Sequence, residues 1–112
     1  FRSTEQELWR IVQESLNNVA KHADARSVAV SLRITPEGAR VEVSDDGRGF
    51  DPGSVTGEHY GLIGMRERAE AIGAHLVVTS RPATGTTVVI EVSADPAVAP
   101  AGIALPALRV RP

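Results

Sequence analysis

The chain has 112 residues, a formal net charge of −2 and no cysteine. This length fits one domain around one core. The balanced charge argues against nucleic acid or an anionic membrane surface as partner, and the lack of cysteine excludes a disulfide framework or a thiolate zinc site. No apolar stretch approaches the ~20 residues that span a bilayer. Because the chain begins at Phe1, we expect a piece of a longer protein, cytoplasmic here and with room for a membrane anchor elsewhere.

The first element predicted is a long amphipathic helix that runs to Ala23. Two overlapping capping boxes open it, Ser3 with Gln6 and Thr4 with Glu7. Its apolar side chains recur at helical spacing: Leu8, Ile11, Val12, Leu16, Val19 and Ala23. This stripe is expected to cover one face of a core.

Four strands and a second helix are predicted after it. The alternation of apolar and polar residues predicts strands at 28–34, 39–44, 75–80 and 86–92, and the helix covers 62–72. Residues 1–93 thus form one domain. The remaining 94–112 hold four prolines among alanines and are expected to be a flexible tail.

A polar face of the first helix carries Glu14, Asn18, Lys21 and His22 when each residue turns the helix by about 100°. A carboxylate and a carboxamide one turn apart suit a hydrated Mg²⁺, with Asn18 as direct ligand. A cation one turn further on suits phosphates. An ordinary solvated face is the alternative interpretation.

The segment Asp45-Asp46-Gly47-Arg48-Gly49-Phe50 follows directly on a predicted strand. A carboxylate can accept hydrogen bonds from an exocyclic amine such as that of adenine, and glycines allow a ligand to approach the backbone closely. This pattern indicates a nucleotide pocket, with a simple hairpin turn as the alternative. The polar, glycine-rich stretch 51–60 is expected to be a mobile loop.

Two further segments contain glycine beside groups that suit a nucleotide. Gly61 and Gly64 open the second helix, whose free N–H groups and positive dipole end favour an anion. Gly85-Thr86-Thr87 opens the last strand, where a hydroxyl can bond a base edge or a water. Each is also compatible with ordinary loop or turn chemistry.

Together and in this order, the four segments resemble the Bergerat-type ATP-binding domain of sensor histidine kinases, DNA gyrase B subunits, large heat-shock chaperones and mismatch-repair ATPases. Within this superfamily, the sequences of the four motifs most resemble those of bacterial sensor kinases of the nitrate/nitrite-sensor type. The resemblance covers about residues 5 to 93. It rests on Glu14-Ser-Leu-Asn-Asn18-Val-Ala-Lys-His22-Ala, Asp45-Asp-Gly-Arg-Gly-Phe50, Gly61-Leu-Ile-Gly-Met-Arg-Glu-Arg68 and Gly85-Thr-Thr87.

The resemblance implies an α+β fold, a two-layer α/β sandwich with a mixed sheet packed on helices. The family usually has a strand before its first long helix. This chain starts almost at that helix, so we expect the strand to be missing or supplied otherwise.

The resemblance also implies roles for individual residues. Glu14, Asn18 and Lys21 would be catalytic, with Asn18 as the ligand of Mg²⁺. The residues expected to contact ATP are Asn18, Lys21, His22, Asp45, Gly47, Gly49, Tyr60, Gly61, Leu62, Gly64, Met65, Thr86 and Thr87. Asp45 would receive the adenine amine, and either threonine would close the adenine side. Gly61 and Gly64 would hold the triphosphate beneath a short lid formed by residues 51–60.

The activity implied is transfer of the γ-phosphate of Mg·ATP to a histidine on a separate helical dimerisation domain, followed by transfer to a response regulator. None of His22, His59 and His75 fits the acceptor role, so the chain alone should bind ATP without phosphorylating itself. Neither nucleic acid nor membrane contact is expected of this domain. The alternatives are an anti-sigma-factor serine kinase on the same scaffold, an ATPase or a nucleotide-dependent interaction module.

Overall fold

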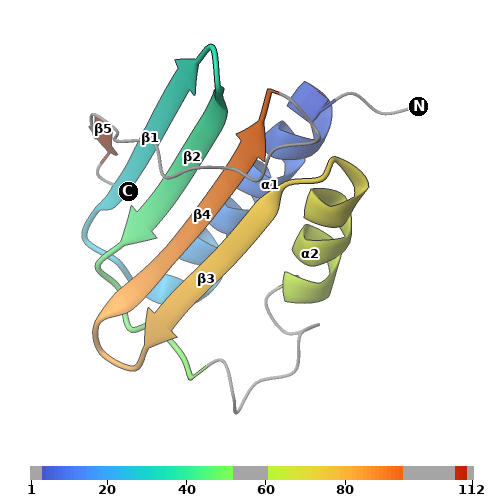
Figure 1. The fold of residues 1–112 in the computed structure, drawn as a ribbon. Helices are drawn as coiled ribbons and strands as arrows, with labels where there is room; N and C mark the ends of the chain where they lie inside the picture. The colour runs from blue at the N-terminus through green and yellow to red at the C-terminus, as the bar shows by residue number, and fades with distance from the viewer. Residues whose placement is uncertain (1–3, 52–60, 95–107, 111–112) are drawn as a thin grey trace.

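The computed structural model describes residues 4–51, 61–94 and 108–110, and shows two layers (Figure 1). One layer contains the helices α1 (Thr4–Asn18), η1 (Val19–Ala23) and α2 (Leu62–Ala71). The other is a sheet of β1 (Val28–Thr35), β2 (Gly38–Asp45), β3 (His75–Arg81), β4 (Gly85–Ser93) and β5 (Leu108–Val110). The helices lie on one face of this sheet, so the predicted two-layer α+β sandwich is confirmed.

The strand order is β3-β4-β2-β1-β5, and every pairing among the described strands is antiparallel. The resemblance had implied a mixed sheet, and this detail was wrong, because the described sheet is purely antiparallel. The reason lies in the connection through α2. It brings the chain back so that β3 runs parallel to β2, but β4 pairs between these two strands and separates them.

The strand β5 was not predicted from the sequence. It pairs with the start of β1, and the register of the backbones matches Val28 with Val110 and Val30 with Leu108. Within the described residues the sheet therefore gains a strand from the C-terminal part of the chain, and no strand precedes α1. The flexibility predicted for the tail concerns mainly 95–107, which lie outside the described residues.

The predicted first helix changes its winding near its end. Regular α-helix stops at Asn18, a π-helical turn covers Val19–Ala23, and Asp24 adopts a left-handed backbone with φ of 49°. The carbonyls of His22 and Ala23 at the end of this turn accept hydrogen bonds from Arg48. Contacts with a distant segment thus accompany the wider turn, and helical periodicity cannot reveal such contacts.

The core fills the space between the helices and the sheet. Alternate residues of each strand face the helices, as the two-residue repeat of a strand requires. One cluster of buried residues joins α1 and α2 to β3 and β4: Ile11, Met65, Ala69, Leu76, Val88 and Ile90. A second joins α1 and η1 to the central strands: Val12, Val19, Ala23, Val28, Val41 and Val43. Both clusters follow the predicted apolar patterns.

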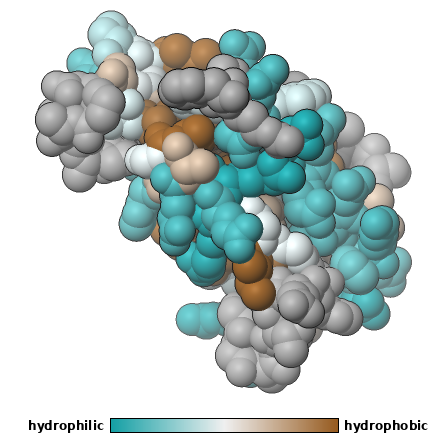
Figure 2. Space-filling view, turned by 90° about the vertical axis from the view of Figure 1, so that its right-hand side faces the viewer, coloured by the Kyte–Doolittle hydropathy of each residue, from teal (hydrophilic) through white to brown (hydrophobic). Residues whose placement is uncertain are grey.

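Large hydrophobic side chains are exposed in several places on the described surface, among them Ile63 and Val77. The side of the molecule that carries α2 is mostly hydrophilic, with hydrophobic residues in small separate areas (Figure 2). Elsewhere, a groove between the first turns of α1 and strands β1 and β2 exposes Trp9, Leu32 and Ile34. No described helix combines the length and apolar character that a bilayer crossing requires.

Candidate nucleotide-binding site

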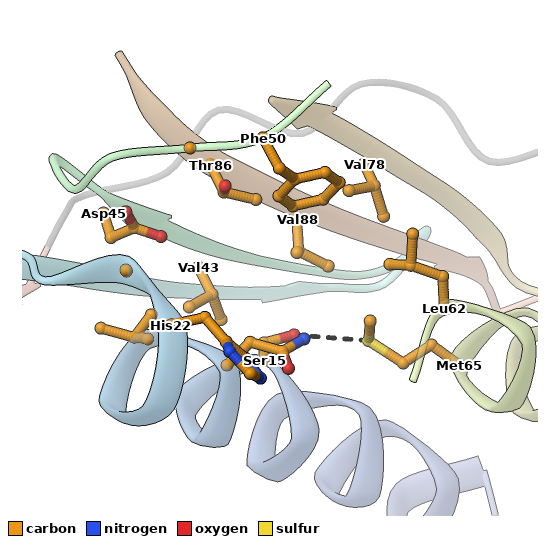
Figure 3. Close-up of a pocket in the computed structure, with 14 residues that line it drawn as sticks. Ser15, His22, Val43, Asp45, Phe50, Leu62, Met65, Val78, Thr86 and Val88 are labelled. Carbon is orange, nitrogen blue, oxygen red and sulfur yellow. Dashed lines mark hydrogen bonds between the residues drawn. The ribbon is translucent and has the colours of Figure 1, made fainter. Parts of the chain in front are cut away.

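A pocket lies between the helical layer and the sheet, close to the end of β2 and the start of β4 (Figure 3). Its polar lining comes from Ser15, Asn18, His22, Asp45 and Thr86. Its apolar lining comes mainly from Val43, Phe50, Leu62, Met65, Val78 and Val88. The pocket thus combines a mainly apolar lining with a few polar groups, as small-molecule sites commonly do.

Asp45 is the carboxylate of this pocket. It is the last residue of β2, it is half-buried, and its Oδ1 accepts a hydrogen bond of 2.8 Å from the Gly47 N–H. Burial raises the pKa of the Asp45 carboxyl above its ordinary value, hydrogen bonds from the Gly47 and Thr86 N–H groups oppose this rise, and the neighbouring Asp46 charge adds to it. The carboxylate is anchored by backbone donors and still lines the cavity.

Asp46, although adjacent, has a different task. Its Oδ1 accepts hydrogen bonds of 2.9 Å from the Arg26 and Ser27 N–H groups, and its Oδ2 accepts one of 3.0 Å from the Ser27 hydroxyl. These bonds, above all that from the Ser27 backbone, lower the pKa of the Asp46 carboxyl. Asp46 therefore ties the segment before β1 to the loop after β2 and faces away from the pocket.

Gly47 lets two backbone segments touch. A Cβ on this residue would lie 2.2 Å from the carbonyl oxygen of Ala23, at the end of η1. The next residue, Arg48, donates its N–H to that same oxygen at 2.7 Å. The loop is therefore fastened to the helix and is not a hairpin turn, because the chain leaves the sheet here and continues to α2.

Gly49 plays a similar part on the other side of the loop. Its φ is +60°, and an added Cβ would lie 2.0 Å from the carbonyl oxygen of Arg81. The hydrogen bond of 2.6 Å from the Ala83 N–H to the Arg48 carbonyl fixes the loop to the β3–β4 turn. The two glycines that the sequence singled out thus seat the loop between η1 and that turn.

A second, polar cavity lies beside the pocket, between α1 and α2. It is lined by Arg10, Gln13, Glu14, Asn17, Gly61, Gly64, Met65 and Arg68. Glu14 reaches across it, because a Cβ on Gly61 would lie 2.6 Å from the Glu14 Oε1. Met65 belongs to both cavities, so the two spaces adjoin.

The structure distinguishes the two candidate threonines. Thr86 faces the helical layer and lines the pocket. Thr87 points to the opposite face of the sheet, where its hydroxyl lies 2.9 Å from that of Ser44. Since successive strand residues point to opposite faces, only Thr86 can reach the pocket.

Of the predicted residues, the pocket gathers Asn18, His22, Asp45, Gly49, Leu62, Met65 and Thr86. Glu14, Gly61 and Gly64 lie on the adjoining cavity, and Gly47 supports the loop from behind. Lys21 is exposed and lines neither cavity, and its role at the phosphates stays a prediction. Tyr60 lies outside the described residues, as does the rest of the predicted lid except Asp51.

Three contributors were not identified from the sequence. Ser15 is buried and lies 3.7 Å from the Met65 sulfur, which links α1 to α2 (Figure 3). The Phe50 ring points into the pocket toward Val78 and Val88. Ser80 lies behind the pocket and bonds the Phe50 N–H. Phe50 could have been found from the sequence, because it is an apolar residue at the end of a glycine-containing loop. A single serine such as Ser15 or Ser80 gives no comparable sequence signal.

No group of three or more potential metal-binding acidic or histidine side chains occurs among the described residues. A magnesium ion would therefore have to take most of its oxygens from water and from phosphates. Magnesium sites commonly have that composition, and one side-chain oxygen from the protein is enough. Asn18, at the pocket wall, is chemically suited to supply it.

Residues 3–96 match the family described as "Histidine kinase-, DNA gyrase B-, and HSP90-like ATPase". The chain belongs to this family. Its membership agrees with the resemblance on which the site residues were chosen. The narrower nitrate/nitrite-sensor type stays a prediction.

Two curated relatives are similar over most of this chain. The "Signal transduction histidine-protein kinase/phosphatase DegS" of Brevibacillus brevis is 38% identical over 85 residues, which are 76% of this chain and 22% of that protein. The "Sensor histidine kinase LiaS" of Bacillus subtilis (strain 168) is 40% identical over 95 residues, 85% of this chain and 26% of that protein. The chain thus spans about a quarter of these relatives.

Solved structures agree. The blue-light activated histidine kinase of Erythrobacter litoralis EL346 has a TM-score of 0.65 at 31% identity, over 77% of this chain and 29% of that one. Its histidine kinase domain alone gives a TM-score of 0.61 at 29% identity, over 77% of this chain and 45% of that one. Both likenesses support the fold and the family.

The contact at Gly47 leads to a stability prediction. Gly47→Ala places a Cβ against the Ala23 carbonyl oxygen, which belongs to the backbone and cannot move aside as a flexible side chain could. The substitution should therefore destabilise the fold by about 1–3 kcal/mol. Gly64→Ala is the matched control, because its Cβ would meet nothing within 4 Å and it lies within α2. Alanine there should stabilise by about 0.5–1 kcal/mol. Urea unfolding measures both, and equal effects would contradict the close approach.

Proposed function

We propose that this chain is the ATP-binding catalytic domain of a cytoplasmic two-component sensor histidine kinase. It would deliver the γ-phosphate of Mg·ATP to a histidine on a separate helical dimerisation domain of the same protein. The observation that carries the proposal is a half-buried carboxylate, Asp45, at the wall of an apolar pocket that adjoins a polar cavity. Family membership and the names of the relatives support it.

The pocket suits the adenine base. Val43 and Val88 from the sheet and Met65 from α2 offer apolar surface to a flat ring, and Asp45 offers an acceptor to its amine. The amine needs such a partner, because a donor buried without an acceptor costs about 1–3 kcal/mol. Asp45 therefore supplies both affinity and recognition.

The adjoining cavity suits the phosphates. Gly61 is the N-cap of α2, and no side chain of the described residues caps the helix there, so its first N–H groups can bind an anion. Two guanidinium groups, those of Arg10 and Arg68, line the same cavity, and Arg68 also pairs with Glu7 at 3.3 Å. Backbone donors and positive charge can thus act on one phosphate chain.

Asn18 would hold the magnesium ion, which neutralises phosphate charge when it is bound. Asn18 lies on the pocket wall one turn after Glu14, which lines the polar cavity. Glu14 would orient an incoming nucleophile or a water from that position. Phosphoryl transfer needs mainly positioning and charge neutralisation, so these residues suffice without a covalent intermediate on the protein.

The acceptor histidine would come from elsewhere. His22 is half-buried in the pocket wall, and His75 is exposed at the start of β3. The phosphorylated domain would then pass its phosphate to a response regulator. An anti-sigma-factor serine kinase on the same scaffold remains the alternative for the test below.

The role of Asp45 can be tested with two matched substitutions. Asp45→Asn places an amide donor against the adenine amine and should weaken ADP binding by about five- to a hundredfold, the scale of one unsatisfied buried donor. Glu42→Gln makes the same carboxylate-to-amide change earlier in β2, at a side chain on the opposite face of the sheet, and should leave the affinity unchanged. Calorimetric titration measures both. Equal affinities for Asp45→Asn and the unsubstituted chain would remove the adenine assignment.

The acceptor can be tested by its chemistry. With γ-labelled ATP and magnesium, the chain alone should take up no label and hydrolyse ATP slowly. Added to the separately produced dimerisation domain of its own protein, it should label that domain at an acid-labile, base-stable site, and Asn18→Ala should abolish the labelling. Acid-stable label on a serine would support the anti-sigma alternative. Rapid hydrolysis by the chain alone would identify an ATPase.

A further inference from the structure

We propose that Ser80, which does not line the pocket, orients the Thr86 hydroxyl so that the pocket selects purines with an amino group at position six. This inference rests on the proposed nucleotide-binding function and deepens it. Ser80 would be a positioning residue for base specificity, acting through Thr86. Its evidence is a set of hydrogen bonds behind the pocket wall.

Ser80 is buried, with 7% of its surface exposed, and it lies in β3 opposite Thr86 of β4. Its Oγ has three polar neighbours. The Phe50 N–H donates to it at 2.9 Å, the Thr86 Oγ1 lies at 2.7 Å, and the Gly85 carbonyl oxygen lies at 3.2 Å. Two of these three neighbouring residues, Phe50 and Thr86, line the pocket.

Counting protons assigns the direction of each bond. The Phe50 N–H can only donate and the Gly85 carbonyl can only accept, whereas each hydroxyl has one proton and can also accept. Ser80 therefore donates to Gly85 and accepts from Phe50, and Thr86 donates its own proton to Ser80. This arrangement satisfies all three contacts. The reverse one would leave the Ser80 and Gly85 oxygens facing each other without a proton.

The consequence for the pocket concerns the lone pairs of Thr86. Because its proton points to Ser80, the Thr86 hydroxyl offers only acceptor capacity to the cavity. Asp45, whose carboxylate accepts from the Thr86 N–H, lines the same cavity and is also an acceptor. Two acceptors fit an amino group with two hydrogens. They oppose the carbonyl oxygen that hypoxanthine and guanine have at the same position.

Removal of the Ser80 hydroxyl should relax this selection. In Ser80→Ala the Thr86 hydroxyl loses its acceptor and can turn its proton into the cavity, where it can donate to a carbonyl oxygen. The ratio of the Kd for inosine diphosphate to the Kd for ADP should fall by about three- to tenfold, the scale of one hydrogen bond. Ser80→Thr keeps a hydroxyl and should restore the ratio. A ratio of affinities within one variant is independent of the folded fraction.

Ser80 also anchors the Phe50 backbone, and a purely structural effect must be separated from orientation of the hydroxyl. Thr86→Val removes the hydroxyl that Ser80 is proposed to orient. In that background, Ser80→Ala should leave the ratio unchanged, since coupled residues do not act additively. A comparable fall in the ratio there would overturn the inference, because the effect would not pass through Thr86.

Calorimetric titration of the unsubstituted chain and these variants with both nucleotides is the complete test. One outcome is that the unsubstituted chain binds ADP but the ratio of the two Kd values in Ser80→Ala stays within about twofold of that of the unsubstituted chain. Such a change is smaller than the effect of one hydrogen bond. The specificity role of Ser80 would then be wrong, while the proposed function would stand. If the unsubstituted chain binds neither nucleotide, the proposed function is wrong and this inference with it.

Discussion

At Gly47 and Ala23 two backbones touch with no room for a Cβ between them, and the pocket depends on this contact. The loop after β2 is held there by the hydrogen bond from Arg48 to Ala23, and Asp46 fastens the same loop to the segment before β1. Asp45 precedes these anchors directly, so the contact fixes its place relative to Asn18 and His22. A side chain at position 47 would separate the helix from the loop and widen the pocket.

The antiparallel sheet adds a second constraint, the alternation of faces. It turns Asp45, Thr86 and Ser80 toward the helical layer and sends Thr87 to the far side. Asp45 and Thr86, which would contact the base, and Ser80, which contacts Thr86, thus come from three neighbouring strands in register. The helices supply the remaining wall: α1 and η1 hold Asn18 and His22, and the start of α2 places Gly61 against Glu14. Binding and phosphate-facing groups are therefore distributed over elements that one core keeps together.

The sequence predicted the two helices and the first four strands correctly, because apolar periodicity is a local signal. The glycines at strand and helix ends are local signals as well, and most of the residues selected around them line the two cavities. Prediction from the sequence failed where tertiary contacts decide. The π-helical turn accompanies hydrogen bonds from Arg48, a residue far along the chain. The strand β5 pairs with β1 despite a proline-rich surrounding sequence, and the sheet is antiparallel because β4 pairs between β2 and β3. Ser80 could not be found because one serine in a strand has no pattern, and its importance comes only from what folding places beside it.

The central claim is that nucleotide binds between η1, the loop after β2 and the start of α2. Amide chemical-shift mapping on addition of Mg·ADP tests it most directly. We expect the largest shifts at residues 18–23, 45–50, 61–65 and 86, with little change at Trp9, Leu32 and Ile34 around the apolar groove. Saturable shifts confined to that groove, or no shifts at the pocket with ADP in excess, would contradict the assignment.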